Sequence, residues 1–268
     1  MALTDGIVGC WSPSVRGSGY LVPGLANNNS LTLYNTAATA WVSSAIRGNS
    51  GRMVEFDGVN DYAGTASRIR FEQQATLSMW LNIITAPGAG LDEIIAELSS
   101  NYTVTNGFLC TIESASFASY CSNVGSTFNG SRFAYAYTVG VPFHAVLNYN
   151  RARGTAANVV EMWVNGAKVS QTQLLTANVA GSNFAFDRVF FGARDGGSVA
   201  PGNFRMGETV LFRRNLTEPE IADLYQRGNG AIGRELTGQT RRRVYGFVPA
   251  GFRAYWVQQK SRVIGGGV

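Results

Sequence analysis

The sequence predicts an all-β protein: an antiparallel β-sandwich of the jelly-roll type, with one short helix near residues 217–227 and a C-terminal extension. Three observations lead to this fold class. Short apolar runs of strand length recur along the chain, each bounded by Gly, Asn, Asp or Pro. Glycine is abundant, at 32 of 268 residues, and supplies many turns. Amphipathic helical segments do not separate the runs, which favours a sandwich over an α/β sheet.

The expected strands are runs in which apolar and polar residues alternate. They cover residues 53–56, 76–81, 108–112, 143–149, 160–164 and 188–191. Trp80 and Trp163 lie within two of these runs and are expected to face the core of the sandwich. Asn165-Gly166 is the strongest hairpin signal in the chain, because both residues tolerate the positive φ of a tight hairpin turn.

The expected helix is marked at both ends. Thr217 and Glu220 have the spacing of a capping box, and Gly228 is suited to the position after the last turn. Its apolar face, expected to pack on the sandwich, consists of Ile221, Leu224 and Tyr225.

Charge divides the chain in two. The net charge is +5, yet residues 231–268 hold seven basic residues and one acid, whereas residues 1–230 hold fifteen basic and sixteen acidic residues. We therefore predict a nearly neutral jelly-roll domain over residues 1–230 and a basic, aromatic extension over residues 231–268. The net positive charge of the chain therefore says something about the partners of the extension and nothing about those of the jelly-roll domain.

The extension is too apolar for a solvated arm that binds nucleic acid, so a nucleic-acid partner is disfavoured. Arginine and aromatic side chains together are typical of protein interfaces. We predict an ordered arm that docks the body to a partner protein. Its candidate partner-binding residues are Arg241, Arg242, Arg243, Tyr245, Phe247, Phe252, Arg253, Tyr255, Trp256 and Arg262.

The N-terminal residues lack the basic start and apolar stretch of a signal peptide, so secretion is not expected. No run approaches 18 uninterrupted apolar residues, and we expect no membrane span. Cys10, Cys110 and Cys121 are then expected to be reduced and buried, with a Cys110–Cys121 disulfide as the alternative.

Several blocks of sequence, in this order, resemble the laminin-G-like (concanavalin A-like) jelly rolls of lectins, glucanases and phage proteins. They are GIVGCW at 6–11, FDGVNDYA at 56–63, ATLSMWLN at 75–82, PFHAVLNYN at 142–150, VEMWVNGAKV at 160–169, FFGARDGG at 190–197 and MGETVLFRRNLTEPEIADLY at 206–225. The resemblance covers roughly residues 5–228 and implies the fold. Because this fold hosts many roles, it implies no single function.

Glucanases on this fold use two glutamates that flank an aspartate on one strand. DEIIAE at 92–97 is similar, since Glu93 and Glu97 would share a strand face with residue 95. Residue 95 is Ile, so the helper acid is missing, and we expect no catalysis. The chain is not expected to be an enzyme.

Some laminin-G-like domains hold calcium, and this resemblance implies candidate oxygen donors in matching loops. They are Asp57, Asn60, Asp61, Asp195 and Glu208. A glycine precedes Glu208 where the family often has Asp, and turn-forming roles for these residues are the favoured interpretation. We therefore expect no cofactor, with calcium as the alternative.

His144 is the one histidine, and its position in the resemblance implies a structural role in or near the core. For a lectin-like role, exposed aromatic residues that stack on sugars are the main requirement. The candidates are Tyr102, Tyr135 and Tyr137, with core packing as the alternative for each.

The C-terminal RAYWVQQKSRVIGGGV resembles the ends of laminin-G-like proteins encoded among phage structural genes. This leads to the main hypothesis, a non-enzymatic virion protein, made in the host cytoplasm, that decorates the capsid or belongs to the tail. Its expected partners are other virion proteins and further copies of itself. The alternative is a glycan-binding module that mediates attachment to a cell surface.

Overall fold

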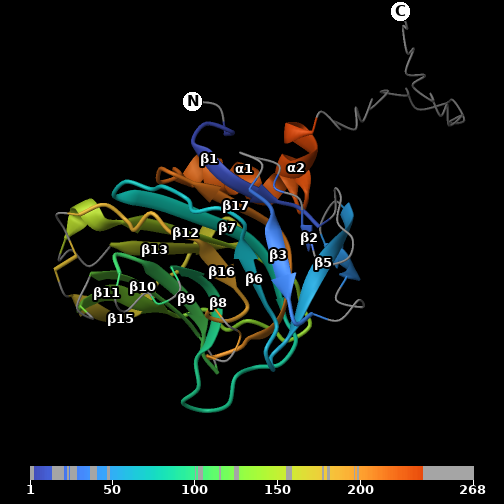
Figure 1. Ribbon diagram of the computed structural model, residues 1–268, viewed down its shortest axis with the longest axis horizontal. Helices are drawn as coiled ribbons and strands as arrows, with labels where there is room; N and C mark the ends of the chain where they lie inside the picture. Colours follow the sequence, from blue (N-terminus) through green and yellow to red (C-terminus); the bar gives the residue numbers. More distant parts are fainter. Residues whose placement is uncertain are drawn as a thin grey trace, which may run out of the picture.

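The computed structural model describes residues 3–237, apart from gaps at 14–20, 23, 25–28, 37–40, 47–48, 100, 102–104, 115, 124–126, 155–158, 177, 180–181, 196 and 198. Within these residues two antiparallel sheets pack face to face, and two short helices lie near the end of the described chain (Figure 1). The predicted fold class, an antiparallel β-sandwich with a helix near 217–227, is confirmed.

The eight-stranded sheet has the order β14-β13-β12-β7-β17-β5-β4, with β1 also paired to β17. Its strands are β1 (Ile7–Trp11), β4 (Trp41–Ile46), β5 (Asn49–Asp57), β7 (Gln74–Ile83), β12 (Phe143–Asn150), β13 (Val160–Val164), β14 (Ala167–Lys168) and β17 (Asn203–Phe212).

The nine-stranded sheet has the order β15-β11-β10-β9-β8-β16-β6-β3-β2. Its strands are β2 (Leu21–Val22), β3 (Leu31–Tyr34), β6 (Tyr62–Thr65), β8 (Glu93–Leu98), β9 (Phe108–Ile112), β10 (Phe117–Asn123), β11 (Thr127–Phe133), β15 (Gln171–Thr176) and β16 (Val189–Phe191). The six predicted strand runs fall on β5, β7, β9, β12, β13 and β16.

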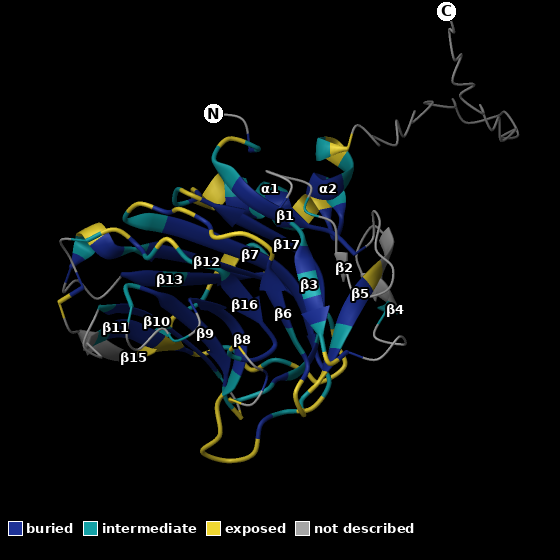
Figure 2. Ribbon diagram, viewed as in Figure 1, coloured by how far each residue is buried: buried dark blue, intermediate teal, exposed yellow. Residues whose placement is uncertain are grey.

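The main core fills the space between the two sheets, where the strands are buried along most of their length (Figure 2). The ring of Tyr149 on β12 stacks on Phe108 of β9, with ring centroids 4.7 Å apart. The buried Tyr149 hydroxyl lies 2.8 Å from Ser119 Oγ, which satisfies its hydrogen bond. Contacts of this kind join the sheets and fix their separation.

A second apolar layer lies on the outer face of the eight-stranded sheet, under α1 (Glu218–Arg227) and α2 (Ala231–Leu236). Trp163 belongs here to the same apolar cluster as Ile221 and Leu224 of α1. Trp80 lies on the same face and stacks on Tyr225, with ring centroids 6.0 Å apart. The prediction that both tryptophans face the sandwich core is therefore wrong, although both are buried. The helices therefore cover apolar side chains of the sheet that would otherwise face solvent.

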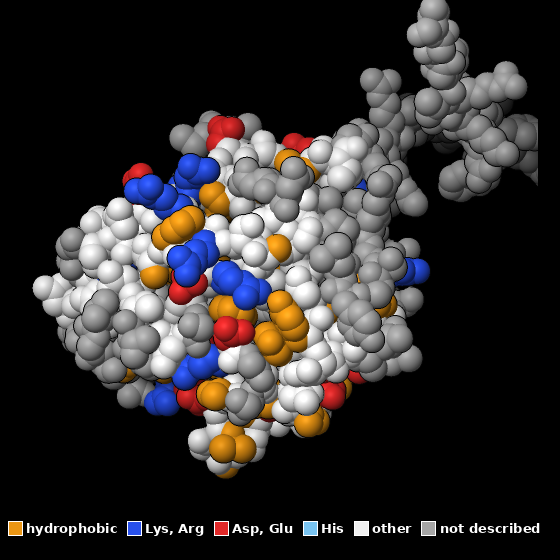
Figure 3. Space-filling view, viewed as in Figure 1, with side chains coloured by type: hydrophobic (Ala, Val, Ile, Leu, Met, Phe, Trp, Pro, Cys, Tyr) orange, Lys and Arg blue, Asp and Glu red, His pale blue; other side chains and the backbone are white. Residues whose placement is uncertain are grey.

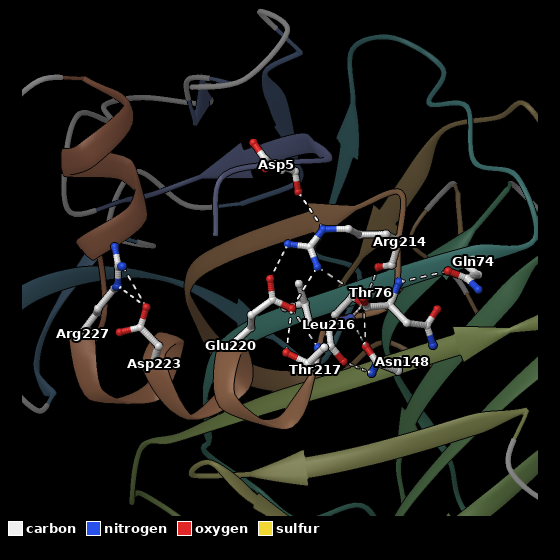
Figure 4. Close-up of polar contacts among 11 residues, drawn as sticks. Asp5, Gln74, Thr76, Asn148, Arg214, Leu216, Thr217, Glu220, Asp223 and Arg227 are labelled. Atoms are coloured by element: carbon white, nitrogen blue, oxygen red, sulfur yellow. Dashed lines mark hydrogen bonds and ion pairs between the residues drawn. The ribbon is translucent and has the colours of Figure 1, made fainter. Parts of the chain in front are cut away.

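Helix α1 is held at its start by a polar cluster (Figure 4). Arg214 donates to both carboxylate oxygens of Glu220, at 2.7 and 2.9 Å. Glu220 also accepts from the backbone amide of Thr217 at 2.9 Å, as the predicted capping box requires. Asn148 donates to the carbonyl oxygen of Leu216 and so ties the segment before the helix to β12. The helix is thus fixed to the sheet by charge-assisted bonds as well as by its apolar face.

The hairpin predicted at Asn165-Gly166 joins β13 to β14, and both residues have positive φ, at 51° and 82°.

The three cysteines are free thiols and buried, so the alternative Cys110–Cys121 disulfide does not form. None of the helices in the described part of the chain is long and apolar enough to span a bilayer.

Helix α2 lies beyond residue 230, the predicted end of the jelly-roll domain, yet it packs on the sandwich. Ile232 is buried in the layer that holds Trp163. The packed body therefore reaches at least to residue 236, and the division into two domains stays a prediction.

Candidate functional site

The candidate site lies on the outer face of the nine-stranded sheet. Helices α1 and α2 pack on the other sheet; on this face Phe190 and Glu97 are buried, whereas Tyr34, Tyr62 and Arg188 are half-buried. Figure 3 shows Lys and Arg side chains interleaved with hydrophobic and acidic ones in a band on one side of the molecule. We call this region the open face and define it by Tyr34, Tyr62, Arg188, Phe190 and the Glu97–Arg194 pair.

Tyr34 and Tyr62 form an aromatic pair at one end of the open face. They are cross-strand partners on β3 and β6, and their rings stack with centroids 4.6 Å apart and an interplanar angle of 11°. Both side chains are half-buried. Beside them Asn35 has positive φ and donates to the carbonyl oxygen of Asn60 at 3.0 Å, which ties the turn after β3 to the loop before β6. Aromatic rings with polar tips are thus presented on a fixed backbone.

Arg188 lies next to this pair. Its guanidinium is 5.0 Å from the centroid of the Phe190 ring, and its Nε donates to the carbonyl oxygen of Thr65 at 2.6 Å. Its Nη2 lies 3.4 Å from the Tyr34 hydroxyl. Gly64 makes this packing possible, since a Cβ there would lie 2.8 Å from Arg188 Nη2. The cation is therefore held in place over an aromatic ring.

A buried ion pair forms the floor beside Phe190. Glu97, opposite Phe190 across β8 and β16, is fully buried and accepts from Arg194 Nε at 3.1 Å. A buried carboxylate of this kind is stabilised only while its partner stays in place. The pair therefore holds Arg194, and with it the start of the loop after β16, against the open face.

The two glutamates of DEIIAE do not lie on one face. A bulge at Ile95 shifts the register of β8, so Glu93 lies opposite the core residue Ile112 and Glu97 lies opposite Leu109. Glu93 accepts from the backbone amide of Asn203 at 3.0 Å, at the rim of the sandwich. The shared face expected from strand alternation is wrong, because a bulge inserts one residue and reverses the alternation. This removes the paired-carboxylate geometry that a retaining glycosidase requires.

Asp57 ends β5, and Asn60 and Asp61 follow in the loop before β6, where the two carboxylates accept backbone amides of the turn. Asp57 Oδ1 accepts from the amide of Val59 at 2.8 Å, and Asp61 Oδ2 accepts from the amide of Asp57 at 3.2 Å. Burial, then the charge of Asp57, raises the pKa of Asp61. In the described part of the chain no three His, Cys, Asp or Glu side chains are grouped to hold a metal. Calcium binding here stays an untested alternative.

Glu208 is not part of that loop cluster. It is buried under α2 and accepts from the amides of Ile232 and Gly233, at 3.2 and 2.7 Å. Burial raises the pKa of Glu208 to about 7, against the lowering effect of these amides. Its two oxygens are occupied by α2, so Glu208 anchors the helix to the sheet.

His144 has the structural surroundings that were expected. Its Nε2 lies 2.8 Å from Ser78 Oγ, and its ring packs against both Trp80 and Tyr225 under α1, with ring centroids 5.0 and 6.3 Å away. Burial lowers the pKa of His144 to about 3, so the ring is neutral at ordinary pH.

The tyrosines proposed for sugar stacking lie elsewhere. Tyr135 packs on Phe117 and Phe143 at the rim of the main core, and the Tyr137 hydroxyl donates to the carbonyl oxygen of Glu113 at 2.8 Å. Both are packing residues. Tyr102 lies outside the described residues, as do the ten candidate partner-binding residues from Arg241 to Arg262.

The sequence alone does not predict the open face, because the residues that form it come from distant segments of the chain. Tyr34 and Tyr62 pair across 28 positions, and Arg188 and Phe190 come from the second half of the chain. The available signal was local: Tyr34 and Tyr62 stand directly before and after turn-forming Asn and Asp residues at strand ends.

Comparison with known proteins gives the fold and no family. No family model matches the chain, and no curated protein matches its sequence. Solved structures do match. The receptor-binding domain of botulinum neurotoxin D has a TM-score of 0.60 at 12% identity, covering 84% of this chain and 53% of that one. The binding domain of Paraclostridial Mosquitocidal Protein 1 has a TM-score of 0.61 at 14% identity, covering 84% and 52%.

A third structure is the ligand-binding domain of botulinum neurotoxin serotype D in complex with N-acetylneuraminic acid. Its TM-score is 0.60 at 12% identity, with 83% of this chain and 51% of that one covered. The likeness is one of fold. This chain spans about half the length of these three structures, each of which is described as a binding domain. The laminin-G-like family, the virion role and the absence of enzyme activity stay predictions.

Proposed function

We propose that the chain is a glycan-binding module whose ligand binds on the open face. The observation that carries this proposal is the stacked Tyr34–Tyr62 pair with Arg188 beside it, on a sheet face that the two helices leave uncovered. Glycan binding is the alternative function expected from the sequence. The residues proposed to bind the glycan differ from those predicted from the sequence.

The chemistry of the open face suits a sugar. A pyranose has apolar C–H faces and a rim of hydroxyls, so it needs aromatic surface together with a few fixed donors and acceptors. Tyr34 and Tyr62 supply rings and hydroxyls, and Arg188 supplies N–H groups on a side chain held by Thr65 and Phe190. Preorganised side chains lose little conformational freedom on binding, which favours affinity.

The similar structures support a role of the same class. They are binding domains, one of them in complex with N-acetylneuraminic acid, and they match this chain in fold. The ligands of those proteins are not known ligands of this chain. For this chain we propose a surface glycan as the ligand.

A glycan array tests the proposal. The full chain should bind a defined subset of glycans, and Tyr34→Ala should lose that binding while its melting temperature shows that it is folded. Tyr120→Ala, a half-buried tyrosine on β10 of the same sheet, is the matched control and should keep it. Absence of binding to all glycans, or equal loss in both variants, would contradict the proposal.

The virion role is a second proposal, and the sequence supports it through the basic and aromatic composition of the extension. Deletion of residues 238–268 should abolish incorporation into particles and leave glycan binding intact. Unchanged incorporation would exclude a docking arm.

A further inference from the structure

We propose that a pocket at the far end of β6 binds the carboxylate or sulfate group of an acidic glycan; this rests on the proposed glycan-binding function. The pocket has a volume of about 220 Å³. The lining residues that matter here are Asn29, Ser67, Arg68, Arg70, Glu72 and Arg213. We call it the arginine pocket.

Local structure directs the arginines to the pocket. Arg68 and Arg70 flank Ile69, whose side chain is buried, on the segment that follows β6. In extended backbone, residues on either side of a buried one share the opposite face. Arg213 comes directly after β17 and is exposed. Two segments that are far apart in the sequence thus bring three arginine residues to the lining of one pocket.

The backbone of the pocket is fixed. Asn29 clamps Ser67 from both sides: its Oδ1 accepts from the Ser67 amide at 2.8 Å, and its Nδ2 donates to the Ser67 carbonyl oxygen at 3.0 Å. The amide of Ile69 donates to the carbonyl oxygen of Asp187 at 2.7 Å. The amide of Arg213 donates to the carbonyl oxygen of Gly6 at 2.8 Å. A pocket held in this way does not need to be assembled when a ligand arrives.

The charge of the pocket is not balanced. Among the described residues that line the pocket, Glu72 is the one acidic side chain, against three arginines. Arg68 is 64% exposed and reaches Asp187 only at 3.8 Å. The ion pairs of the described residues do not include Arg70 or Arg213. By contrast, six other arginines hold a carboxylate at 3.1 Å or less: Arg132, Arg153, Arg194, Arg205, Arg214 and Arg227.

An oxyanion matches this arrangement. Guanidinium groups bind carboxylate and sulfate oxygens through paired N–H donors, and such charge-assisted bonds are stronger than neutral ones. A pocket of this volume holds a charged group with part of its sugar ring, whereas drug-sized ligands occupy larger cavities of roughly 300–1,000 Å³.

The pocket is within reach of the aromatic pair. β6 begins at Tyr62 and ends at Thr65, and Arg68 follows three residues later. At about 3.3 Å per residue, Tyr62 and Arg68 lie at most about 20 Å apart. Arg188 lies between them through its bond to Thr65. One acidic oligosaccharide can therefore contact the tyrosines with its neutral part and the arginine pocket with its charged end.

Calorimetric titration of the full chain with matched probes tests the proposal. The probes are lactose, 3′-sialyllactose, sulfated lactose and inorganic sulfate, which separate neutral sugar, carboxylate, sulfate ester and free anion. We expect at least one acidic sugar to bind ten or more times more tightly than lactose. Arg70→Gln/Arg213→Gln should remove that preference and leave lactose binding unchanged. Arg52→Gln, an exposed arginine on the other sheet, should change neither.

Equal affinity for lactose and both acidic sugars, or a preference that survives in the double variant, would overturn the arginine pocket and leave the proposed function standing. If none of these sugars and no glycan of the array binds, the proposed function fails. In that case, binding of inorganic sulfate to the wild type and its loss in the double variant would still support an anion site in the arginine pocket. If the wild type does not bind sulfate either, the anion site is overturned too.

Discussion

Tyr34 and Tyr62 lie directly opposite each other on neighbouring strands, and their rings stack at 4.6 Å on the face that α1 and α2 leave uncovered. Cross-strand aromatic pairs stabilise a sheet by about 0.2–1 kcal/mol, which is little compared with the loss of a core residue. Their removal should therefore affect binding far more than folding, and this separates the site from its scaffold.

Glu220→Gln should weaken the attachment of α1. Hydrogen bonds from Arg214 lower the pKa of Glu220 to about 2, so the stabilisation is present above the ordinary carboxyl value near 4.5 and is lost as pH falls toward 2. We expect the variant to unfold with roughly 1–2 kcal/mol less free energy at pH 7. Urea unfolding should show this difference disappear by about pH 2, and a difference that is the same at both pH values would contradict the account.

Glu208 should give the opposite pH dependence. Because burial raises its pKa to about 7 from near 4.5, the native state keeps a proton that the unfolded state releases between these values. Its contribution to stability is full below pH 4.5 and falls by roughly 2–3 kcal/mol as pH rises to 7.

The contribution of Glu208 is isolated by comparing wild type with Glu208→Gln. His144, whose pKa is lowered to about 3, contributes stability above pH 6.5 that is lost as pH falls toward 3, and this term is common to both proteins. The unfolding free energy of the variant relative to wild type should rise between pH 4.5 and 7. A constant difference would show that Glu208 does not titrate in this window.

Two truncations should separate α2 from the residues that follow it. A chain that ends at residue 237 keeps Ile232 and the two amides bonded to Glu208, and a chain that ends at residue 230 loses them. Loss of a buried isoleucine costs about 2–5 kcal/mol, so the shorter chain should unfold with at least about 2 kcal/mol less free energy than the longer one. Equal stability of the two truncated chains would show that α2 does not contribute to the body.

Calcium should have little effect on the folded chain. The Asp57 and Asp61 carboxylates already accept backbone amides within their own turn. Thermal unfolding with calcium and with a chelator should differ by less than about 1 °C, since a ligand that binds the native state raises its melting temperature. A rise of several degrees that Asp61→Asn abolishes would establish the calcium site instead.

Local signals in the sequence predicted the fold well. Asn165-Gly166 forms the hairpin, and Thr217 and Glu220 start the helix, because both signals act within four residues. The prediction for the two tryptophans is wrong. Alternation shows that two faces differ, but Trp80 and Trp163 lie on a face that α1 covers, and alternation does not say which face is the inner one.

The site was harder to predict than the fold. Strand pairing between β3 and β6 creates the tyrosine pair, and the arginine pocket joins Arg68 and Arg70 to Arg213 from far along the chain. The β8 bulge at Ile95 places Glu93 and Glu97 on opposite faces of the sheet. No residue type in DEIIAE predicts a bulge at this position. Each of these features depends on register or on contacts between distant segments, which the pattern of neighbouring residues does not contain.

The most direct test of the proposed glycan site is the affinity of Tyr34→Ala/Tyr62→Ala for the best glycan from the array, measured by titration calorimetry. The account predicts at least a tenfold loss, equal to about 1.4 kcal/mol, with a melting temperature close to that of wild type and full affinity in Tyr120→Ala. An unchanged affinity in the folded double variant would contradict the central claim that the open face binds the glycan.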